Sequence, residues 1–335
     1  MIRNAAILFL GIVVIVICLP AAAVSIGRPP SPRIEPEAEE EPEPAPEPES
    51  IKIRFYRTDL DEVVTMDLEE YLVGVVLAEM PSSFEMEALK AQAVAARTYT
   101  LKRSRLMGGQ GCDNSPEPAD ICSDSTHCQA WLDPQKKAMD SSAAEADHDL
   151  ARVRAAVEAT AGEVIVYEGH LIEAVYHSTC GGRTESSQAI WSGGPTPYLQ
   201  DLICPYCSHS PYYRRETLIS YETLGEALLK DVAIPAATMA QLPLAVLEET
   251  PGGRVGILQV SESKFEGKEI RTLLGLPSTA FTWEHREDGL LFKTHGHGHG
   301  VGLCQYGADG AAASGKNYRQ ILSFYYPGTD IIFTK

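Results

Sequence analysis

The N-terminal part of the chain constrains the fold most, because neither of its two segments can form a globular core. Residues 5–23 are almost entirely apolar, with Arg3 before them, and a run of this length is enough to cross a bilayer. Residues 29–50 then hold eight Pro and eight Glu, a composition that favours a disordered, extended spacer. The sequence therefore predicts a cytoplasmic stub and transmembrane anchor over 1–28, a linker over 29–50 and one folded part over 51–335.

Two interpretations of the apolar run stay open. Ala21-Ala22-Ala23 is typical of a signal-peptidase site, which would make the run a removable leader. The length of the run favours a permanent single-pass anchor instead. Both interpretations place the folded part outside the cytoplasm. The net charge of −18 argues against nucleic acid as a partner.

Alternating and helical patterns follow one another without βαβ order, which predicts an α+β fold. Segments 51–56 and 62–66 alternate with period two, so we expect a hairpin. Helices are expected from the Asp67 cap to Glu79, from Ser82 or Ser83 to about Arg105, over 149–161 and over 217–229, and strands over 163–168, 171–177 and 254–260. The prediction is a set of mixed helices and short antiparallel strands in one large domain or two lobes.

Glu79 is the most informative single residue. Leu72, Val76 and Glu79 share one face of the expected helix. A carboxylate on an apolar face loses solvation, which raises its pKa, and an acid that stays protonated near neutral pH can donate a proton to a glycosidic bond. Gln92 and Arg97 on the next helix are candidates to bind substrate beside it. The alternative is a surface glutamate at a frayed helix end.

A loop rich in cysteine follows these helices. Cys122, His127 and Cys128 lie close in sequence, with Cys112 upstream. Thiolates and an imidazole in a short loop match zinc ligands, and Cys112, His177 or water would supply the fourth. A disulfide between two of the cysteines is the alternative.

Two glycine-rich segments, 176–185 and 295–307, are expected to bind a ligand rich in hydroxyl groups. Glycine lets the backbone approach a ligand closely, and polar side chains supply hydrogen bonds. The candidate binding residues in them are His177, Ser178, Gly181, Gly182, Thr184, His299, Gln305 and Tyr306. For His295 and His297 we favour a solvent-exposed His-Gly loop over a metal site.

Further cysteines and tryptophans leave alternatives open. Cys204 and Cys207 resemble a redox dithiol, but the sequence after them is poor for a helix, so we expect a disulfide or a secondary metal site. Cys180 is a candidate partner for one of them. Trp131 and Trp191 are either stacking platforms for sugar rings or core residues.

Several segments together resemble the stage II sporulation protein D family. They are Leu68–Pro81, Glu87–Tyr99, Ser123–Trp131, His177–Glu185, Gly267–Leu276 and Gly298–Ala308. Because they occur in register over about 51–335, the resemblance is specific. The chain departs from the family at Cys304, where Ser is usual, and in the absence of a His near Asn114.

The resemblance implies a peptidoglycan lytic transglycosylase that cleaves the MurNAc–GlcNAc bond of glycan strands to 1,6-anhydroMurNAc ends during engulfment. It implies that Glu79 is the single general acid and base and that Cys122 and Cys128 are zinc ligands. The zinc is expected to be structural, and no organic cofactor is expected. The rival activities are a zinc-dependent peptidoglycan amidase and a non-catalytic wall-binding activator of an amidase.

The resemblance also implies partners and a location. The expected partners are glycan strands whose stem peptides have been removed, the amidase that removes them, and membrane proteins of the engulfment complex. The expected location is the mother-cell membrane, with the folded part facing the forespore.

Overall fold

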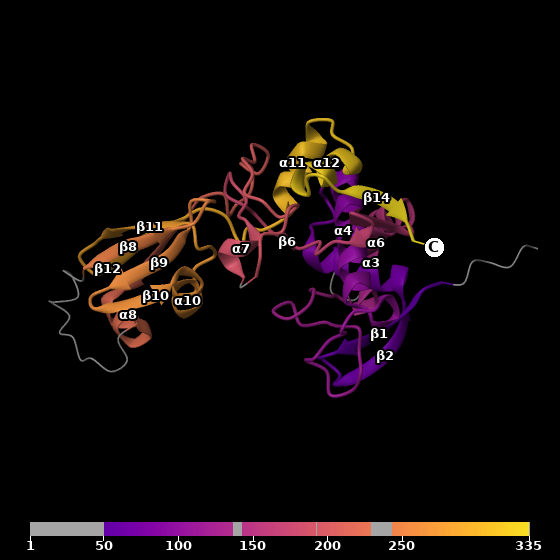
Figure 1. Ribbon diagram of the computed structural model, residues 1–335, viewed down its shortest axis with the longest axis horizontal. Helices are drawn as coiled ribbons and strands as arrows, with labels where there is room; N and C mark the ends of the chain where they lie inside the picture. The colour runs from indigo at the N-terminus through magenta and orange to yellow at the C-terminus, as the bar shows by residue number, and fades with distance from the viewer. Residues whose placement is uncertain (1–49, 137–142, 192, 229–242, 335) are drawn as a thin grey trace, which may run out of the picture. The chain divides into compact units, whose positions relative to one another are not determined.

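The computed structural model describes residues 50–136, 143–191, 193–228 and 243–334 of the chain (Figure 1). The expected anchor and linker lie outside these ranges, apart from Ser50. The compact unit begins at Ser50, and in it helices and short strands are mixed, so the α+β prediction is confirmed. Within the described ranges, no helix is both long and apolar enough to cross a membrane.

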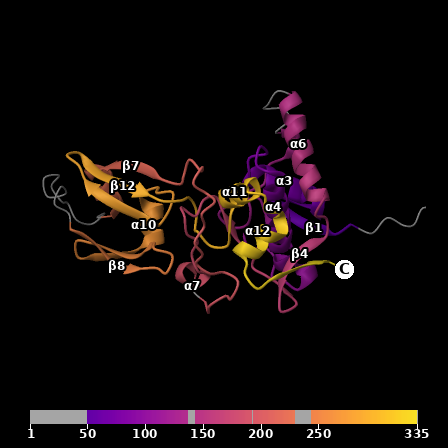
Figure 2. The same cartoon turned by 90° about the horizontal axis from the view of Figure 1, so that it is seen from above.

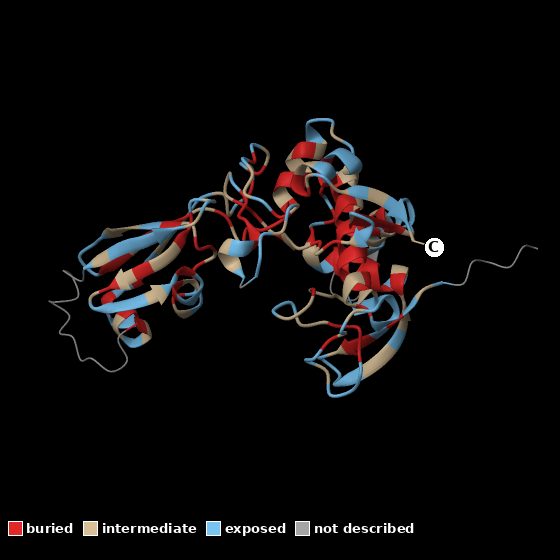
Figure 3. Ribbon diagram, in the orientation of Figure 1, coloured by how far each residue is buried: buried red, intermediate tan, exposed pale blue. Residues whose placement is uncertain are grey.

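Helices form most of the larger core. The helices of the described ranges are α3 (Leu68–Glu79), α4 (Met86–Arg103), α6 (Ala143–Glu158), α7 (Ser187–Ile190), α8 (Tyr221–Leu228), α10 (Gly267–Leu273), α11 (Gln305–Ala313) and α12 (Tyr318–Tyr325), with a 3₁₀ turn at Arg105–Met107. Helix α4 contacts α3, α6, α11 and α12 (Figures 1 and 2). Its alanines, among them Ala91 and Ala95, are fully buried and allow these neighbours to approach closely (Figure 3).

Helix α3, which ends at Glu79, is buried on more than one face. Asp67 caps it as predicted, since its side chain accepts hydrogen bonds from the backbone N–H groups of Glu69 and Glu70. The Glu70 side chain pairs with Arg154. Residues 71–77 are all buried, because the β1–β2 hairpin, α4 and α6 surround the helix.

The start of α4 was predicted wrongly. The helix begins at Met86 with Glu85 as the N-cap residue, and not at Ser82 or Ser83. The Phe84 N–H donates to the Pro81 carbonyl at 3.0 Å, so the residues after Pro81 form a separate turn. The N–H of Glu85 is bonded to the Asp309 carboxylate at 2.8 Å, which fixes the helix start from another part of the chain.

Short strands cover the helices. They are β1 (Lys52–Arg57), β2 (Glu62–Asp67), β3 (Ile121–Cys122), β4 (Glu163–Tyr167), β5 (His170–Leu171), β6 (Tyr176–His177), β13 (Leu303–Cys304) and β14 (Asp330–Phe333). The predicted hairpin is confirmed, with β1 antiparallel to β2. Strand β6 pairs in parallel with β13, which joins His177 to Cys304. The predicted strand over 171–177 is therefore two short strands with a gap.

A second hydrophobic core lies in the segment between β6 and β13. Its strands are β7 (Arg215–Ser220), β8 (Leu244–Glu249), β9 (Val255–Val260), β10 (Ser263–Glu266), β11 (Phe281–His285) and β12 (Gly289–Thr294), in two sheets ordered β11-β12-β7 and β10-β9-β8. The predicted strand over 254–260 is confirmed as β9. The predicted helix over 217–229 is wrong in its first turn, because Thr217 and Ile219 pair with β12 and only α8 is helical. The described unit thus contains two large cores.

The His-Gly segment is held against β6 and is not the exposed loop we expected. Thr179 and His297 exchange backbone hydrogen bonds of 3.1 and 2.7 Å. Gly296 has φ +82°, and a Cβ there would lie 2.5 Å from the Thr179 carbonyl oxygen. Only glycine fits this position, so the segment packs closely enough to bring His299 beside His177, with their ring centroids 5.5 Å apart.

Candidate active site

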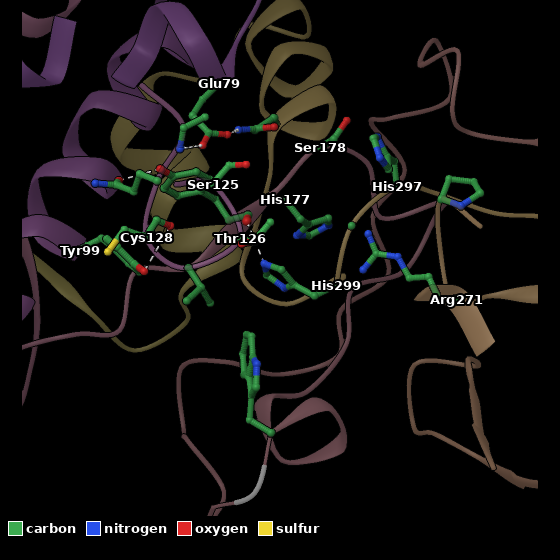
Figure 4. Close-up of a pocket in the computed structure, with 18 of the residues that line it drawn as sticks. Glu79, Tyr99, Ser125, Thr126, Cys128, His177, Ser178, Arg271, His297 and His299 are labelled. Carbon is green, nitrogen blue, oxygen red and sulfur yellow. Dashed lines mark hydrogen bonds between the residues drawn. The ribbon is translucent and has the colours of Figure 1, made fainter. Parts of the chain in front are cut away.

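A cavity of about 1550 Å³ opens beside the end of α3 (Figure 4). It exceeds the roughly 300–1,000 Å³ of pockets for small molecules, so it suits an extended ligand. Segments far apart in sequence line it: Glu79, Ser125–Ala130, Val175–Ser178, Arg271–Leu276 in part, His297–His299 and Gln305–Tyr306. The cavity is thus built where the two glycine-rich segments meet the helical core.

Glu79 is held on the cavity wall by two neutral donors. Its Oε1 accepts a hydrogen bond from the Ala130 N–H at 3.0 Å, and its Oε2 accepts one from the Gln305 amide at 3.0 Å. Burial raises the pKa of Glu79, and the bonds from Gln305 and Ala130 oppose this shift. The net direction is upward, so the carboxyl group keeps its proton to a higher pH than an exposed glutamate.

His177 lines the cavity and has a buried ring nitrogen without a partner among the described residues. Its Nδ1 lies 3.0 Å from the Val301 carbonyl oxygen, and since a carbonyl only accepts, Nδ1 carries the proton. Burial lowers the pKa of His177 well below its ordinary value, so the ring is neutral. Its buried Nε2 has no partner among the described residues and is therefore left to accept a hydrogen bond from a ligand.

His299 has no such free atom. Its Nε2 donates to the Tyr176 carbonyl at 2.9 Å, and its Nδ1 accepts from the Val301 N–H at 3.1 Å. Burial lowers the pKa of His299 to about 4. The ring is therefore a neutral wall element, and its other neighbour is Trp191, whose ring centroid lies 5.2 Å away.

Ser178, Gln305 and Tyr306, three of the residues that we expected to bind a ligand, also line the cavity. The Tyr306 N–H donates to the Ser178 carbonyl at 3.0 Å, which joins the two glycine-rich segments at this wall. The Tyr306 ring packs edge-on against Phe84 at 4.9 Å between centroids. The turn after Pro81, next to Glu79, is therefore in contact with the segment that supplies Gln305.

Gln92 and Arg97 do not line the cavity, contrary to our prediction. Arg97 is fully buried, and its Nε and Nη2 donate to the Glu69 carboxylate at 2.9 and 2.6 Å. Its Nη1 donates to the Glu163 carbonyl at 3.1 Å. Gln92 is fully buried as well. Both residues belong to the face of α4 that packs inside the protein, and we correct their role to a structural one.

Gly181, Gly182 and Thr184 also lie outside the main cavity. The Thr184 hydroxyl donates to the Gln200 carbonyl at 3.0 Å and accepts from the Leu202 N–H at 2.7 Å. Gly181 lines a smaller cavity of about 250 Å³. The Thr184 hydroxyl that we expected to bind a ligand is therefore occupied by hydrogen bonds within its own loop, and its role is to hold the chain after β6.

The two tryptophans with open roles divide between core and cavity. Trp131 packs against Phe55, with ring centroids 5.0 Å apart, and lies directly over Gly74. Trp191 lines the cavity and is 43% exposed. Trp191 is therefore the one of the pair that is available for stacking.

Sequence reasoning missed several charged residues of the cavity. Glu173 is a second carboxylate on its lining, and Arg103, Arg215 and Arg271 line it too. Glu173 was hidden inside a segment that reads as one alternating strand, and the arginines had no motif around them. The cationic groups are notable in a chain of net charge −18, since they favour an anionic ligand.

Cys112, Cys122, His127 and Cys128 come together beside this cavity in what we call the mixed centre. Their ligand atoms all lie within 4.8 Å of one another. His127 Nδ1 is 3.5, 3.6 and 3.3 Å from the three sulfurs in chain order, close to the edges of about 3.5–3.8 Å that follow from zinc bond lengths in a tetrahedron. His127 Nε2 lies 2.7 Å from Asp113 Oδ1, an orienting contact typical of metal-bound histidine. The four residues fit a zinc ion.

The fold and the cavity define an α+β protein in which a half-buried glutamate lines a cavity large enough for an extended ligand, next to a cysteine–histidine centre. The chain belongs to the stage II sporulation protein D family. Residues 56–167 match the family model described as Stage II sporulation protein. The predicted family, and with it a protein of sporulation, is confirmed.

Curated relatives extend the match beyond that region. The chain is 35% identical over 283 residues to stage II sporulation protein D of Bacillus amyloliquefaciens, which covers 84% of this chain and 78% of that protein. It is 34% identical over 287 residues to stage II sporulation protein D of Bacillus subtilis (strain 168), covering 84% and 79%. It is also similar to the amidase enhancer of Bacillus subtilis (strain 168), at 27% identity over 309 residues, covering 78% of this chain and 40% of that protein.

Proposed function

We propose that this protein is a lytic transglycosylase that cleaves peptidoglycan glycan strands during engulfment, with Glu79 as its general acid and base. The observation that carries the proposal is the state of Glu79. It lies on a polymer-sized cavity, its pKa is raised by burial, and its two recorded partners are neutral donors. An acid held in this way keeps its proton to a higher pH than an exposed glutamate and is therefore better suited to protonate a leaving oxygen.

The reaction needs only this one carboxyl group. The protonated Glu79 donates its proton to the oxygen that bridges MurNAc and GlcNAc, and the bond between that oxygen and MurNAc C1 breaks. The ionised Glu79 then takes the proton of the C6 hydroxyl of the same MurNAc as O6 bonds to C1. A 1,6-anhydro ring closes, Glu79 ends protonated as it began, and no water is consumed. Hydrolysis would instead use water and, in most enzymes, a second carboxylate.

The remaining groups of the cavity suit a glycan ligand. The free Nε2 of His177 can accept a hydrogen bond from a sugar hydroxyl. Trp191 offers a partly exposed ring for stacking on a sugar face. Arg271 and Arg103 supply positive charge for the lactyl carboxylates of MurNAc once stem peptides are removed. This chemistry supports denuded glycan as the substrate and an amidase as the enzyme that prepares it.

Zinc in the mixed centre would be structural. Three thiolates and one imidazole close the tetrahedron, whereas catalytic zinc keeps a position open for water. When bound, the ion would cross-link the loop that ends in Ala130. That loop contains the Ala130 N–H, which donates a hydrogen bond to Glu79. This donor set argues against the rival activity of a zinc-dependent amidase.

A non-catalytic role has one observation in its favour, the similarity to a protein named amidase enhancer. In that role the cavity would bind wall glycan, the protein would activate a partner amidase, and Glu79 would make no product. The proposed activity predicts anhydro ends, and the alternative predicts binding without bond cleavage.

The test is product analysis on denuded glycan strands by mass spectrometry. Full-length protein is expected to release fragments ending in 1,6-anhydroMurNAc, and Glu79→Ala protein is expected to release none while folding normally. A chelator is expected to slow the reaction without changing the product. Anhydro product from Glu79→Ala protein would contradict the proposal, and freed stem peptides from intact peptidoglycan would support the amidase.

The proposed place of action is the mother-cell membrane, with the folded part facing the forespore beside other membrane proteins of engulfment. A fluorescent fusion followed through sporulation tests this. The proposal expects fluorescence at the engulfing membrane, and a signal spread evenly through the mother-cell cytoplasm would contradict it.

A further inference from the structure

Four cysteines outside the mixed centre meet at one point in the interior. They are Cys180, Cys204, Cys207 and Cys304. None is more than 2% exposed, and their sulfur atoms all lie within 4.8 Å of one another. They come from three segments far apart in sequence: the turn after β6, the 204–207 loop and the end of β13. We call this group the four-cysteine centre.

The spacing of the sulfurs fits a single tetrahedral ion. Zinc–sulfur bonds of about 2.3 Å give sulfur–sulfur distances of about 3.8 Å in a tetrahedron. The Cys180 and Cys207 sulfurs lie 3.4 Å apart, well beyond the roughly 2.05 Å of a disulfide bond. None of the four cysteines forms a disulfide bond. Four sulfur ligands in this geometry select zinc or iron over the harder cations.

Hydrogen-bond donors point at the sulfurs, as negative thiolates require. The backbone N–H groups of Cys180 and Gly307 both donate to Cys304 Sγ at 3.2 Å. The Tyr325 hydroxyl lies 3.1 Å from Cys204 Sγ in a fully enclosed position. Cys304 also caps the nine-residue helix α11, so its sulfur lies at the positive end of the helix dipole.

A buried cation accompanies the centre. Arg254 is 1% exposed, and its Nη2 donates to the Cys180 carbonyl at 3.1 Å while its Nη1 donates to Ser278 Oγ at 2.7 Å. A zinc ion with four thiolates carries a net charge of about −2, and a guanidinium in this position offsets part of it.

We propose that the four-cysteine centre binds one zinc ion. Metal binding there does not depend on the proposed enzymatic activity. The ion would join three segments, and two of them carry cavity residues. Ser178 precedes the ligand Cys180 by two positions, and Gln305 directly follows the ligand Cys304. The centre would thereby fix the amide that donates to Glu79.

The test counts metal in the full-length protein, purified without oxygen or chelator. The informative variant is Cys122→Ser/Cys128→Ser, because it removes the mixed centre and leaves the four-cysteine centre untouched. It is expected to retain one zinc per chain by elemental analysis. X-ray absorption at the zinc edge is expected to show four sulfur neighbours at about 2.3 Å and no nitrogen.

The matched variant is Cys204→Ser/Cys207→Ser, which is expected to lose one zinc per chain relative to the parent. If it fails to fold, as circular dichroism would reveal, the absorption spectrum of the first variant still decides. Two results would overturn the proposal. One is a folded Cys122→Ser/Cys128→Ser protein that holds no metal after zinc is added. The other is alkylation and intact mass showing these cysteines joined in two disulfides.

Discussion

The Gln305 amide lies 3.0 Å from the Glu79 carboxylate, although the two residues are 226 positions apart in the chain. Gln305 begins α11 directly after β13, and β13 is positioned by its parallel pairing with β6. The side-chain partner of Glu79 therefore comes from α11, in the C-terminal part of the chain. The pKa of Glu79 depends on that long-range closure.

Replacing Gln305 by Ala is expected to raise the pKa of Glu79 further. The Gln305 amide donates to the ionised carboxylate and so lowers its pKa. Because the first step of the proposed reaction needs protonated Glu79, activity should be lost as pH rises through this pKa, and the alkaline limb of kcat/KM is expected to move to higher pH. Gln259→Ala, which changes a glutamine on β9 bonded to the Ser261 carbonyl, is the control and is expected to leave the profile unchanged.

Glu79→Gln is expected to reduce the release of anhydro product by at least about 100-fold, the usual contribution of a general acid. The variant is expected to be as stable as the parent at neutral pH, or more stable. The folded-state pKa of Glu79 is raised by burial, so its contribution to stability is present at low pH and is lost as pH rises through that pKa. Glutamine carries no charge, so the variant avoids the free-energy cost of burying an ionised carboxylate. Thermal unfolding at pH 5 and pH 8 checks the sign, and a variant that unfolds more easily at pH 8 would contradict it.

Glu173→Gln separates a one-carboxylate from a two-carboxylate mechanism. If Glu79 acts alone, this variant still forms 1,6-anhydro ends, with at most a change in KM. If Glu173 served as a second catalytic carboxylate, it would be needed to activate water, and the parent enzyme would release reducing ends. Mass spectrometry distinguishes the two products by the mass of one water.

Removing the zinc that we propose for the mixed centre is expected to lower the unfolding temperature and to slow the proposed reaction, with the product unchanged. The physical reason is that the loop carrying Ala130 loses its cross-link. The Cys122→Ser/Cys128→Ser variant is expected to show the same two losses without any chelator, and a further effect of chelator on this variant would come from the four-cysteine centre. A chelated parent with full activity and unchanged unfolding would count against a structural zinc there.

Trp191→Ala and Trp131→Ala form a matched pair. Trp191 lines the cavity and is 43% exposed, so its loss is expected to raise KM for glycan strands without lowering stability. Trp131 packs on Phe55 and Gly74, and its loss is expected to cost about 3 kcal/mol of unfolding free energy. Denaturant titration and substrate kinetics on both variants test this division, and equal effects on both readouts would refute it.

Local signals predicted well the elements that depend on local interactions. The β1–β2 hairpin and the Asp67 cap follow from alternation and from a side chain that bonds its own helix. The strand conformation of Thr217–Ser220 could not be predicted from such local signals, because it comes from pairing with β12. Helical periodicity predicted that Glu79 lies on the apolar face of its helix. It could not show that the Arg97 guanidinium pairs with the Glu69 carboxylate.

The candidate site divides in the same way. The glycine-rich segments contain His177, Ser178 and Gln305, and the structure brings all three to the cavity. Glu173 and the arginines were out of reach of sequence reasoning, since no local pattern distinguishes a cavity carboxylate from a strand residue. Cys304 appeared only as a departure from the usual family residue, and its partners became visible once three distant segments were seen together.

Half of the hydrogen bonding recorded for Glu79 comes from main chain. The Ala130 N–H is present whatever side chain stands at that position, with proline as the exception. A substitution at residue 130 therefore leaves this hydrogen bond to Glu79 in place, whereas we expect the loss of the mixed centre to disturb it. A relative that lost the mixed centre would have to regain this donor by lengthening or repacking the loop, and such compensating changes are where divergence within the family is best sought.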